Sequence, residues 1–469
     1  MWRNAPDLGA NWKTQNIKIN PMLSSLVNIF KIPELKKKIL FTLGIIAVYR
    51  VGCYVPTPGV NGAVLAEYFQ QISQSGAGAI FGIMNMFSGG AVERMTIYAL
   101  GIMPYISSSI IMQLLIAVIP ALEKLAKEGQ AGYMKINQYT RYGTLALGLV
   151  QSFFIALWLE NPQIFEGYQI VTHPGWGFRF LTVITLTTGT LILMWLGERI
   201  QEKGIGNGIS LIITASIISA GPSAINTLYL LMSGDSGGAR QIQPLTLVVM
   251  VFFLIGVIWA VTLITQGQRK IPVQYARRVV GRKVYGGQST YLPLKVDTSG
   301  VIAIIFAQSI ILFPSTLASF IPHPWFQSFA AYLTRGGWIY YTIYGLFIIF
   351  FCYFYTAIVF NPVDVAENMK KHGAFIPGVR PGTQTADYLD FVLTRITLAG
   401  ALFICSIAIM PDAIMASFKV PYLVASFFGG TGVLIMVGVM LDTMKQIESH
   451  LLMRHYDGFM KTGQLRGRR

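Results

Sequence analysis

The chain has 469 residues, of which 53% are hydrophobic and only 12% are charged. This composition excludes a soluble globular protein, because a soluble domain of this size needs far more charged surface, and it indicates an integral membrane protein. The net charge of +16 would suggest nucleic-acid binding in a soluble domain, but in a membrane protein it is first tested against the rule that Lys and Arg gather in cytoplasmic loops.

Residues 1–38 form an amino-terminal extension that lacks the apolar core and the cleavage site of a signal peptide. Lys36, Lys37 and Lys38 stand directly before the first apolar segment. They predict that this end of the chain stays on the cytoplasmic side. An interfacial anchor and a disordered segment are both compatible with residues 1–30.

Ten apolar windows predict an all-α polytopic membrane protein, and all but the short window at 396–410 are long enough to cross a bilayer. The predicted transmembrane helices cover residues 39–55, 96–118, 142–159, 178–196, 209–231, 245–266, 301–320, 338–360, 396–410 and 422–441. They divide into two five-helix halves, 39–231 and 244–445. A Gly-rich external hinge at 232–243 joins the halves, and 446–469 is a tail.

The positions of the basic residues support this topology. The amino terminus, the loops at 120–141, 197–208, 267–300 and 361–395, and the end of the chain from Lys445 onward carry 30 of the 36 Lys and Arg residues. Only six lie on the opposite side. This asymmetry predicts that both termini are cytoplasmic, and it accounts for the high net charge without nucleic acid.

The segment at 78–94 is apolar and Gly-rich, but it is too short to span a membrane. The predicted helix that follows carries Pro104, Gln113 and a run of serines where a lipid anchor would need only apolar residues. Broken backbone at membrane depth is tolerated only where protein or a cavity surrounds it. The two segments together therefore predict a short re-entrant helix beside a pathway through the membrane.

Two of the predicted cytoplasmic loops are too long to be simple connectors. In the loop 267–300, the alternation of Ile271, Val273 and Tyr275 and a turn near Gly281 predict a β-hairpin. In the loop 361–395, several Gly and Pro residues place Arg380 at the tip of a stiff turn. We interpret the two loops as docking surfaces for a partner. The alternative is that their basic residues only fix the orientation of the protein in the membrane.

The sequence contains no nucleotide-binding loop, no HExxH motif and no Cys or His cluster of metal-ligand spacing. We therefore assign no catalytic residue, no metal and no cofactor. GIGNG at 204–208 predicts a tight turn into a helix. The predicted helices carry almost no ionisable residue near their midpoints, which disfavours the alternative of a secondary transporter for small solutes.

Two pairs of isoleucines are spaced one helical turn apart, Ile102 with Ile106 and Ile209 with Ile213. Core or lipid-facing positions are the ordinary explanation of such spacing. If the two faces meet, however, they form an apolar constriction that excludes hydrated ions by dewetting.

Several long stretches resemble the SecY family of bacterial protein-conducting channels. They include MFSGGAVERMTIYALGIMPYISSSII, LMWLGERIQEKGIGNGIS and FYTAIVFNPVDVAENMKKHGAFIPGVRPG, and they cover the chain in the expected order from about residue 32 to 454. The sequence departs from the family at Asp297 and Thr298, where Asn and an apolar residue are expected. It departs again at Ala303 and Ile304, where Pro-Ala is expected.

The resemblance implies roles for particular residues. The pore ring would be formed by Ile102, Ile106, Ile209, Ile213, Ile305 and Ile435. The plug that seats against the ring would include Ile80, Phe81, Met84, Met86, Phe87, Ser88, Gly89 and Gly90. A lateral gate would include Ser107, Gln113, Ser309 and Phe313. The contacts with a motor or the ribosome would be Lys270, Arg277 and Arg380.

The resemblance also implies a function and partners. The protein would pass unfolded secretory polypeptides across the bacterial inner membrane and release hydrophobic segments sideways into the lipid bilayer. Its partners would be the small membrane subunits SecE and SecG, the motor ATPase SecA, the ribosome, signal peptides and nascent chains.

Overall fold

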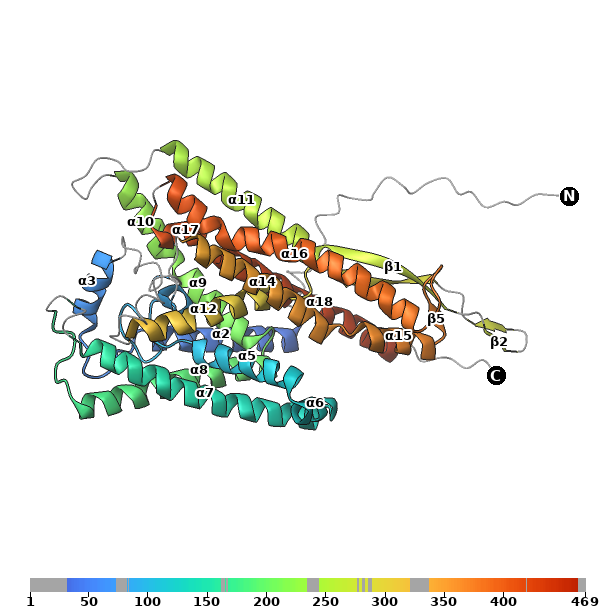
Figure 1. Cartoon of the computed structure of the whole chain (residues 1–469), viewed down its shortest axis with the longest axis horizontal. Coiled ribbons are helices and arrows are strands. Elements are labelled where there is room, and N and C mark those ends of the chain that lie inside the picture. Colours follow the sequence, from blue (N-terminus) through green and yellow to red (C-terminus); the bar gives the residue numbers. More distant parts are fainter. Residues whose placement is uncertain are drawn as a thin grey trace.

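The computed structural model describes residues 32–72, 82, 84–161, 165, 168–233, 244–275, 278–280, 283–285, 289–320, 337–418 and 420–462. The helices run mainly along the long axis of the molecule, and the strands gather at one end (Figure 1). We call this the sheet end.

The first half of the chain is helical throughout its described elements. Its helices are α2 (Pro33–Gly52), α3 (Gly62–Ile72), α5 (Met103–Val118), α6 (Pro120–Lys127), α7 (Gln130–Leu159), α8 (Trp176–Lys203), α9 (Gly208–Ser219) and α10 (Gly221–Ser233). In the second half they are α11 (Pro244–Gln266), α12 (Val301–Phe320), α14 (Trp338–Val359), α15 (Pro362–Lys371), α16 (Thr383–Phe418), α17 (Tyr422–Phe428) and α18 (Thr431–Thr462). Helices α7 and α8 lie on one flank of the bundle and α11 and α16 on the other (Figure 1).

Among the described residues, seven helices are long and apolar enough to span a membrane, and α5 with α6 adds an eighth if this pair, bent by 99°, is one span. The position of a helix in the bundle decides how much of it is buried. In the most apolar part of Val424–Leu451, which is mostly α18, 72% of the residues are buried, whereas in α11 the share is 17%. Helix α18 therefore lies at the centre of the bundle, and α11 lies at its edge with apolar side chains facing outward.

The expected helix at 96–118 is wrong in its first part, because Thr96 forms an isolated β-bridge with Pro56, residues 97–102 form turns, and α5 begins only at Met103. Gly101 has a φ of +57° and Met95 a φ of 45°, which are not helical values. Pro104 lies in the first turn of α5, a position that suits a residue without an N–H. An apolar window cannot distinguish such a turn from a helix.

The expected helix at 422–441 is broken between α17 and α18. Gly430 lies at the break with a φ of +102°, and a Cβ there would stand 2.1 Å from Pro411. The close approach of α16 therefore requires glycine at this break.

The expected hairpin is present as two nested pairs of strands. Strand β1 (Gln268–Tyr275) pairs with β4 (Ser289–Lys295), and β2 (Arg278–Val280) pairs with β3 (Lys283–Tyr285), all antiparallel. Strand β5 (Ala374–Phe375), from the second long loop, pairs with the end of β1. Ile271 and Val273 alternate with exposed residues and pack against Leu389 of α16, so the two loops form one unit fixed to the bundle.

Candidate functional site

A cavity of about 430 Å³ lies between α5, α7, α8, α9 and α12. Its polar lining comes from the ends of α7 and α8 and from the turn before α9, with Asn137, Arg141, Glu198, Glu202 and Asn207. Its apolar lining includes Ile106, Ile209, Ile213 and Ile305. The cavity thus combines a charged rim with an isoleucine-lined wall.

All six isoleucines of the expected pore ring lie in one apolar cluster. Five of them are buried, and Ile209 is partly buried and packs against the others. Ile102 and Ile435 do not line the cavity but belong to the same cluster. Ala303 and Ile304, two of the departures from the family, are also fully buried there. The structure therefore brings together residues from α5, α9, α12 and α18 that are far apart in the sequence.

The turn before α9 holds Ile209 in place, as the GIGNG motif predicts. The Asn207 side chain accepts hydrogen bonds from the N–H groups of Ile209 (3.2 Å) and Ser210 (3.4 Å) and so caps α9. The preceding turn is held by two other helices, because Ile205 N–H donates to Thr42 Oγ1 of α2 (3.1 Å) and Gly206 N–H donates to Gln446 Oε1 of α18 (2.9 Å).

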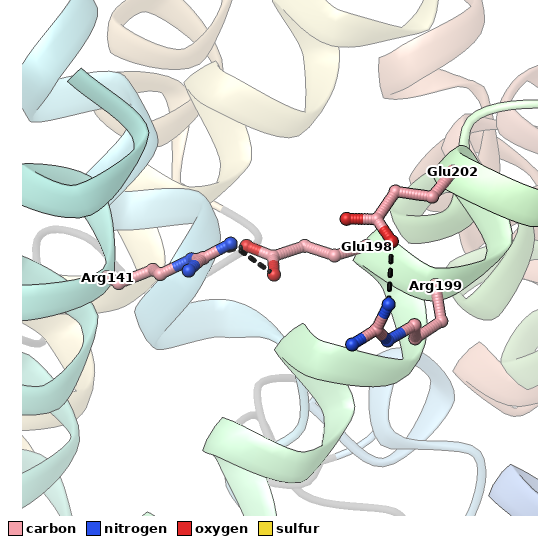
Figure 2. A network of polar contacts seen from close by, with 4 residues as sticks. All are labelled: Arg141, Glu198, Arg199 and Glu202. Atoms are coloured by element: carbon pink, nitrogen blue, oxygen red, sulfur yellow. Dashed lines mark hydrogen bonds and ion pairs between the residues drawn. The ribbon is translucent and has the colours of Figure 1, made fainter. Parts of the chain in front are cut away.

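Two ion pairs involve residues that line the cavity (Figure 2). Arg141 of α7 donates two hydrogen bonds to the Glu198 carboxylate of α8, at 2.9 and 2.8 Å. Arg199 and Glu202 pair within α8 at 2.8 Å. The Arg141 side chain is 48% exposed and that of Glu198 is 21% exposed, so the pair contributes at most about 1 kcal/mol. Opposite charges near the ends of neighbouring predicted helices are the only sequence signal for this contact.

The described part of the expected plug packs against the isoleucine cluster. Residues 84–88 are helical, and Met86 and Phe87 belong to the same buried cluster as the ring residues. The Asn85 side chain then closes the following turn, since its Oδ1 accepts from Glu93 N–H (3.1 Å) and its Nδ2 donates to Glu93 Oε2 (3.0 Å). Met84 and Gly90 are partly buried, and Ser88 and Gly89 are buried; Ile80 and Phe81 lie outside the described residues.

The expected lateral gate lies where α5 packs against α12. Ser107 and Gln113 are half-buried, and Gln113 lines the cavity. Ser309 is 2% exposed and its hydroxyl has no hydrogen-bond partner among the described residues. The neighbouring Gln308, which is not among the expected gate residues, is 3% exposed. Neither its amide nitrogen nor its amide oxygen has a hydrogen-bond partner among the described residues. The side chain of Phe313 is not among those that the structure describes.

The basic residues expected to contact a partner lie on the sheet end. Lys270 is exposed on β1, on the face opposite Ile271. Arg380 lies next to a turn, and its carbonyl accepts a hydrogen bond from Thr385 Oγ1 (2.8 Å) at the start of α16. Arg277 lies outside the described residues. The pairing of β1 with β5 joins the two loops that carry Lys270 and Arg380.

Asp297 is buried at the start of α12. Its carboxylate accepts hydrogen bonds from Gly300 N–H (2.7 Å) and from Ser299 Oγ (3.1 Å). Burial raises the pKa of this carboxyl, although both hydrogen bonds oppose the shift. Asp297 therefore acts as a structural cap. Within the described ranges, no group of three or more His, Cys, Asp or Glu side chains could hold a metal ion.

Comparison with solved structures gives the same fold. One structure, described as a protein conducting channel, matches with a TM-score of 0.59 at 18% identity and covers 91% of this chain and 97% of that one. Sec61 in a canine ribosome-channel complex matches with a TM-score of 0.57 at 17% identity over the same shares of the two chains.

Comparison with known sequences gives the family. The SecY family model matches residues 96–444. The protein translocase subunit SecY of Escherichia coli K12 is 47% identical over 439 residues, which is 92% of this chain and 96% of that protein. SecY of Aquifex aeolicus is 44% identical and covers 94% of this chain and 100% of that protein. The chain therefore belongs to the SecY family of protein translocase subunits.

Proposed function

We propose that this protein forms the pore of a protein-conducting channel in a bacterial inner membrane. It passes unfolded secretory polypeptides across the membrane and lets hydrophobic segments leave sideways into lipid. The observation that carries the proposal is the cavity whose apolar wall is made of isoleucines from α5, α9 and α12. The similar proteins are named as a protein translocase subunit and a protein conducting channel, which supports a transport role.

The proposed topology has ten transmembrane helices in two halves. Helices α2 and α12, each of 20 residues, join the eight spans that length and composition identify. The sheet end then faces the cytoplasm together with both termini, because 30 of the 36 basic residues lie in the segments on that side.

The isoleucine ring is proposed to act as a seal. Ions cannot pass an apolar constriction because they would lose their hydration shell without compensation. An extended polypeptide can pass, since aliphatic side chains can move aside and close again around it. In the idle channel the segment at 80–94 acts as the plug. This role is supported by Met86 and Phe87, which belong to the same apolar cluster as the ring isoleucines.

The seam between α5 and α12 is proposed to be the lateral gate. When the seam opens, a passing segment meets lipid, and each Leu, Ile, Phe or Val at the centre of a helix gains roughly 0.3 to 0.6 kcal/mol by entering it. Gln308 of α12 is buried with no partner for its amide among the described residues. This supports the idea that α12 moves easily, because a buried polar group without a hydrogen bond destabilises the packing around it.

Directed movement requires an external motor, and the sheet end is the proposed docking surface. Lys270, Arg277 and Arg380 would contact the motor ATPase SecA or the ribosome, and SecE and SecG would be the small membrane partners. The pairing of β1 with β5 supports this role, since a docking site needs rigid elements.

Crosslinking to a stalled chain tests the pathway. Ile209 is replaced by Cys in a variant without Cys53, Cys352 and Cys405, and a secretory chain is arrested midway in membranes that contain the variant. We expect an adduct that requires a functional signal sequence. Ile255, which is 58% exposed on α11, is replaced by Cys as the matched control and should give none. An engaged chain that reacts at neither position, or equally at both, would contradict the proposed pathway.

A further inference from the structure

Arg50 is a charged side chain near the end of the apolar helix α2. Its Nη1 donates to the carbonyl oxygen of Gly89 (3.0 Å) and to Ser219 Oγ of α9 (2.8 Å). Within the described part of the chain, no carboxylate forms an ion pair with it. Ionisable groups in membrane helices are costly and usually serve a function, and here the guanidinium joins the plug segment to a ring-bearing helix.

Tyr49 makes a parallel connection one residue earlier. Its side chain is buried at 1% exposure and its ring stacks on Tyr98. The hydroxyl donates to the carbonyl oxygen of Ser88 (3.1 Å) and shares a hydrogen bond of 2.5 Å with Ser216 Oγ. Two consecutive side chains of α2 therefore hold two consecutive carbonyls of the plug segment and two hydroxyls of α9.

The partners on α9 are placed to sense the ring. Ser216 and Ser219 are three residues apart, so they lie on one face of the helix. The same helix carries Ile209 in its first turn and Ile213 one turn later. A displacement of α9 that widens the ring would withdraw both hydroxyls from Tyr49 and Arg50.

We propose that Tyr49 and Arg50, together called the α2 latch, are positioning residues that couple the plug to the pore ring through α9. The inference rests on the proposed plug and extends it with a release mechanism. With α9 in place, the latch side chains are held where they bind the Ser88 and Gly89 carbonyls. When a polypeptide moves α9, the latch loses half of its hydrogen bonds and the plug is freed at the same time.

Idle ion leak through proteoliposomes tests the latch. The channel is purified with the membrane proteins that accompany it, and the decay of a potassium gradient is followed without substrate. Tyr49→Phe keeps the stacked ring and removes the hydroxyl, and we expect the leak to rise about fivefold, the effect of losing one buried hydrogen bond. Tyr98→Phe is the matched control, since it removes the other hydroxyl of the stacked pair, and its leak should equal that of the wild type.

A double-variant cycle separates coupling from general destabilisation. Ser216→Ala alone should also raise the leak, and adding it to Tyr49→Phe should raise the leak by less than the product of the two single effects. Arg50→Lys keeps the charge but loses the planar guanidinium group, and it should leak more than the wild type. Ser219→Thr keeps the hydroxyl, and its leak should equal that of the wild type. Independent effects of the two hydroxyls, or equal leak from Tyr98→Phe and Tyr49→Phe, would overturn the latch.

Translocation of a secretory protein is measured in the same vesicles. Normal translocation with unchanged idle leak in every variant would refute the latch and leave the conduit intact. Failure of the wild type to translocate, with its motor and signal sequence present, would instead refute the proposed function.

Discussion

The contact between α8 and α9 offers a sharp test, because two glycine positions bring the helices together beside the proposed pore ring. A Cβ on Gly208 would stand 1.9 Å from the carbonyl oxygen of Gly197, 2.7 Å from its carbonyl carbon and 2.9 Å from Cβ of Ile200. Real Cβ atoms essentially never come closer than 3.0 Å to a heavy atom outside their own residue, its chain neighbours and the adjoining helix backbone. Gly208→Ala therefore requires α8 and α9 to separate by at least about 1.1 Å.

The obstacle at Gly208 is backbone, so no side-chain rotation can relieve it. Overpacking of a core typically costs about 1 to 3 kcal/mol, and we expect the upper part of this range here. Small residues at helix interfaces in membranes serve such close approach. Because Ile209 is the next residue and lies close to Gly197, the displacement also moves a ring side chain.

The assay compares thermal unfolding of the purified protein and idle ion leak for Gly208→Ala and Gly256→Ala. Gly256 lies within α11, and a Cβ there would have nothing within 4 Å, so alanine should leave stability unchanged or raise it by up to about 1 kcal/mol. We expect a lower unfolding temperature and a higher leak for Gly208→Ala only. Equal stability and equal leak for the two variants would refute the close-packing argument.

Four further outcomes follow from other contacts. Charge reversal at Arg141 or at Glu198 should lower the unfolding temperature slightly, corresponding to about 1 kcal/mol or less, and reversal of both charges should restore it. If the double variant does not regain the wild-type unfolding temperature, the ion pair is not the cause of the loss in stability. Gln308→Leu should raise the unfolding temperature by removing an unpartnered buried amide and should slow translocation of a chain with a weakly hydrophobic signal sequence; faster translocation would contradict this view of the gate. Asp297→Asn keeps the capping oxygen and removes a carboxyl whose pKa burial raises. A buried carboxyl with a raised pKa destabilises the folded state as the pH rises from the pKa of the unfolded chain through the higher pKa of the folded protein. The variant should therefore be more stable than the wild type at neutral pH, and this gain in stability should disappear below about pH 4. A gain in stability that does not depend on pH would refute the argument. Arg380→Glu should abolish translocation in reconstituted vesicles while the protein still assembles, and normal secretion would remove its docking role.

Local features were predictable from the sequence because their causes are local. Apolar windows mark the spans, turn residues mark the GIGNG turn before α9, and alternation marks the β1 strand. Hydropathy placed the start of α5 seven residues too early, since residues 96–102 are as apolar as a helix but turn at Gly101. It also did not show that α17 and α18 are separated by a break at Gly430.

The candidate site depends on contacts between residues that are remote in the sequence. Isoleucine spacing on single helices suggested a constriction, but only the packing of α5, α9, α12 and α18 brings those residues into one cluster. The pairing of Arg141 with Glu198 and the contacts of the α2 latch join residues that are 39 to 169 positions apart. Hydropathy along the chain determined that this protein crosses a membrane several times, and the distribution of charge supports the proposed arrangement of its loops. The tertiary structure alone decided which polar and apolar faces meet, because helix rotation and contact are set by packing between helices and not by the composition of any one of them.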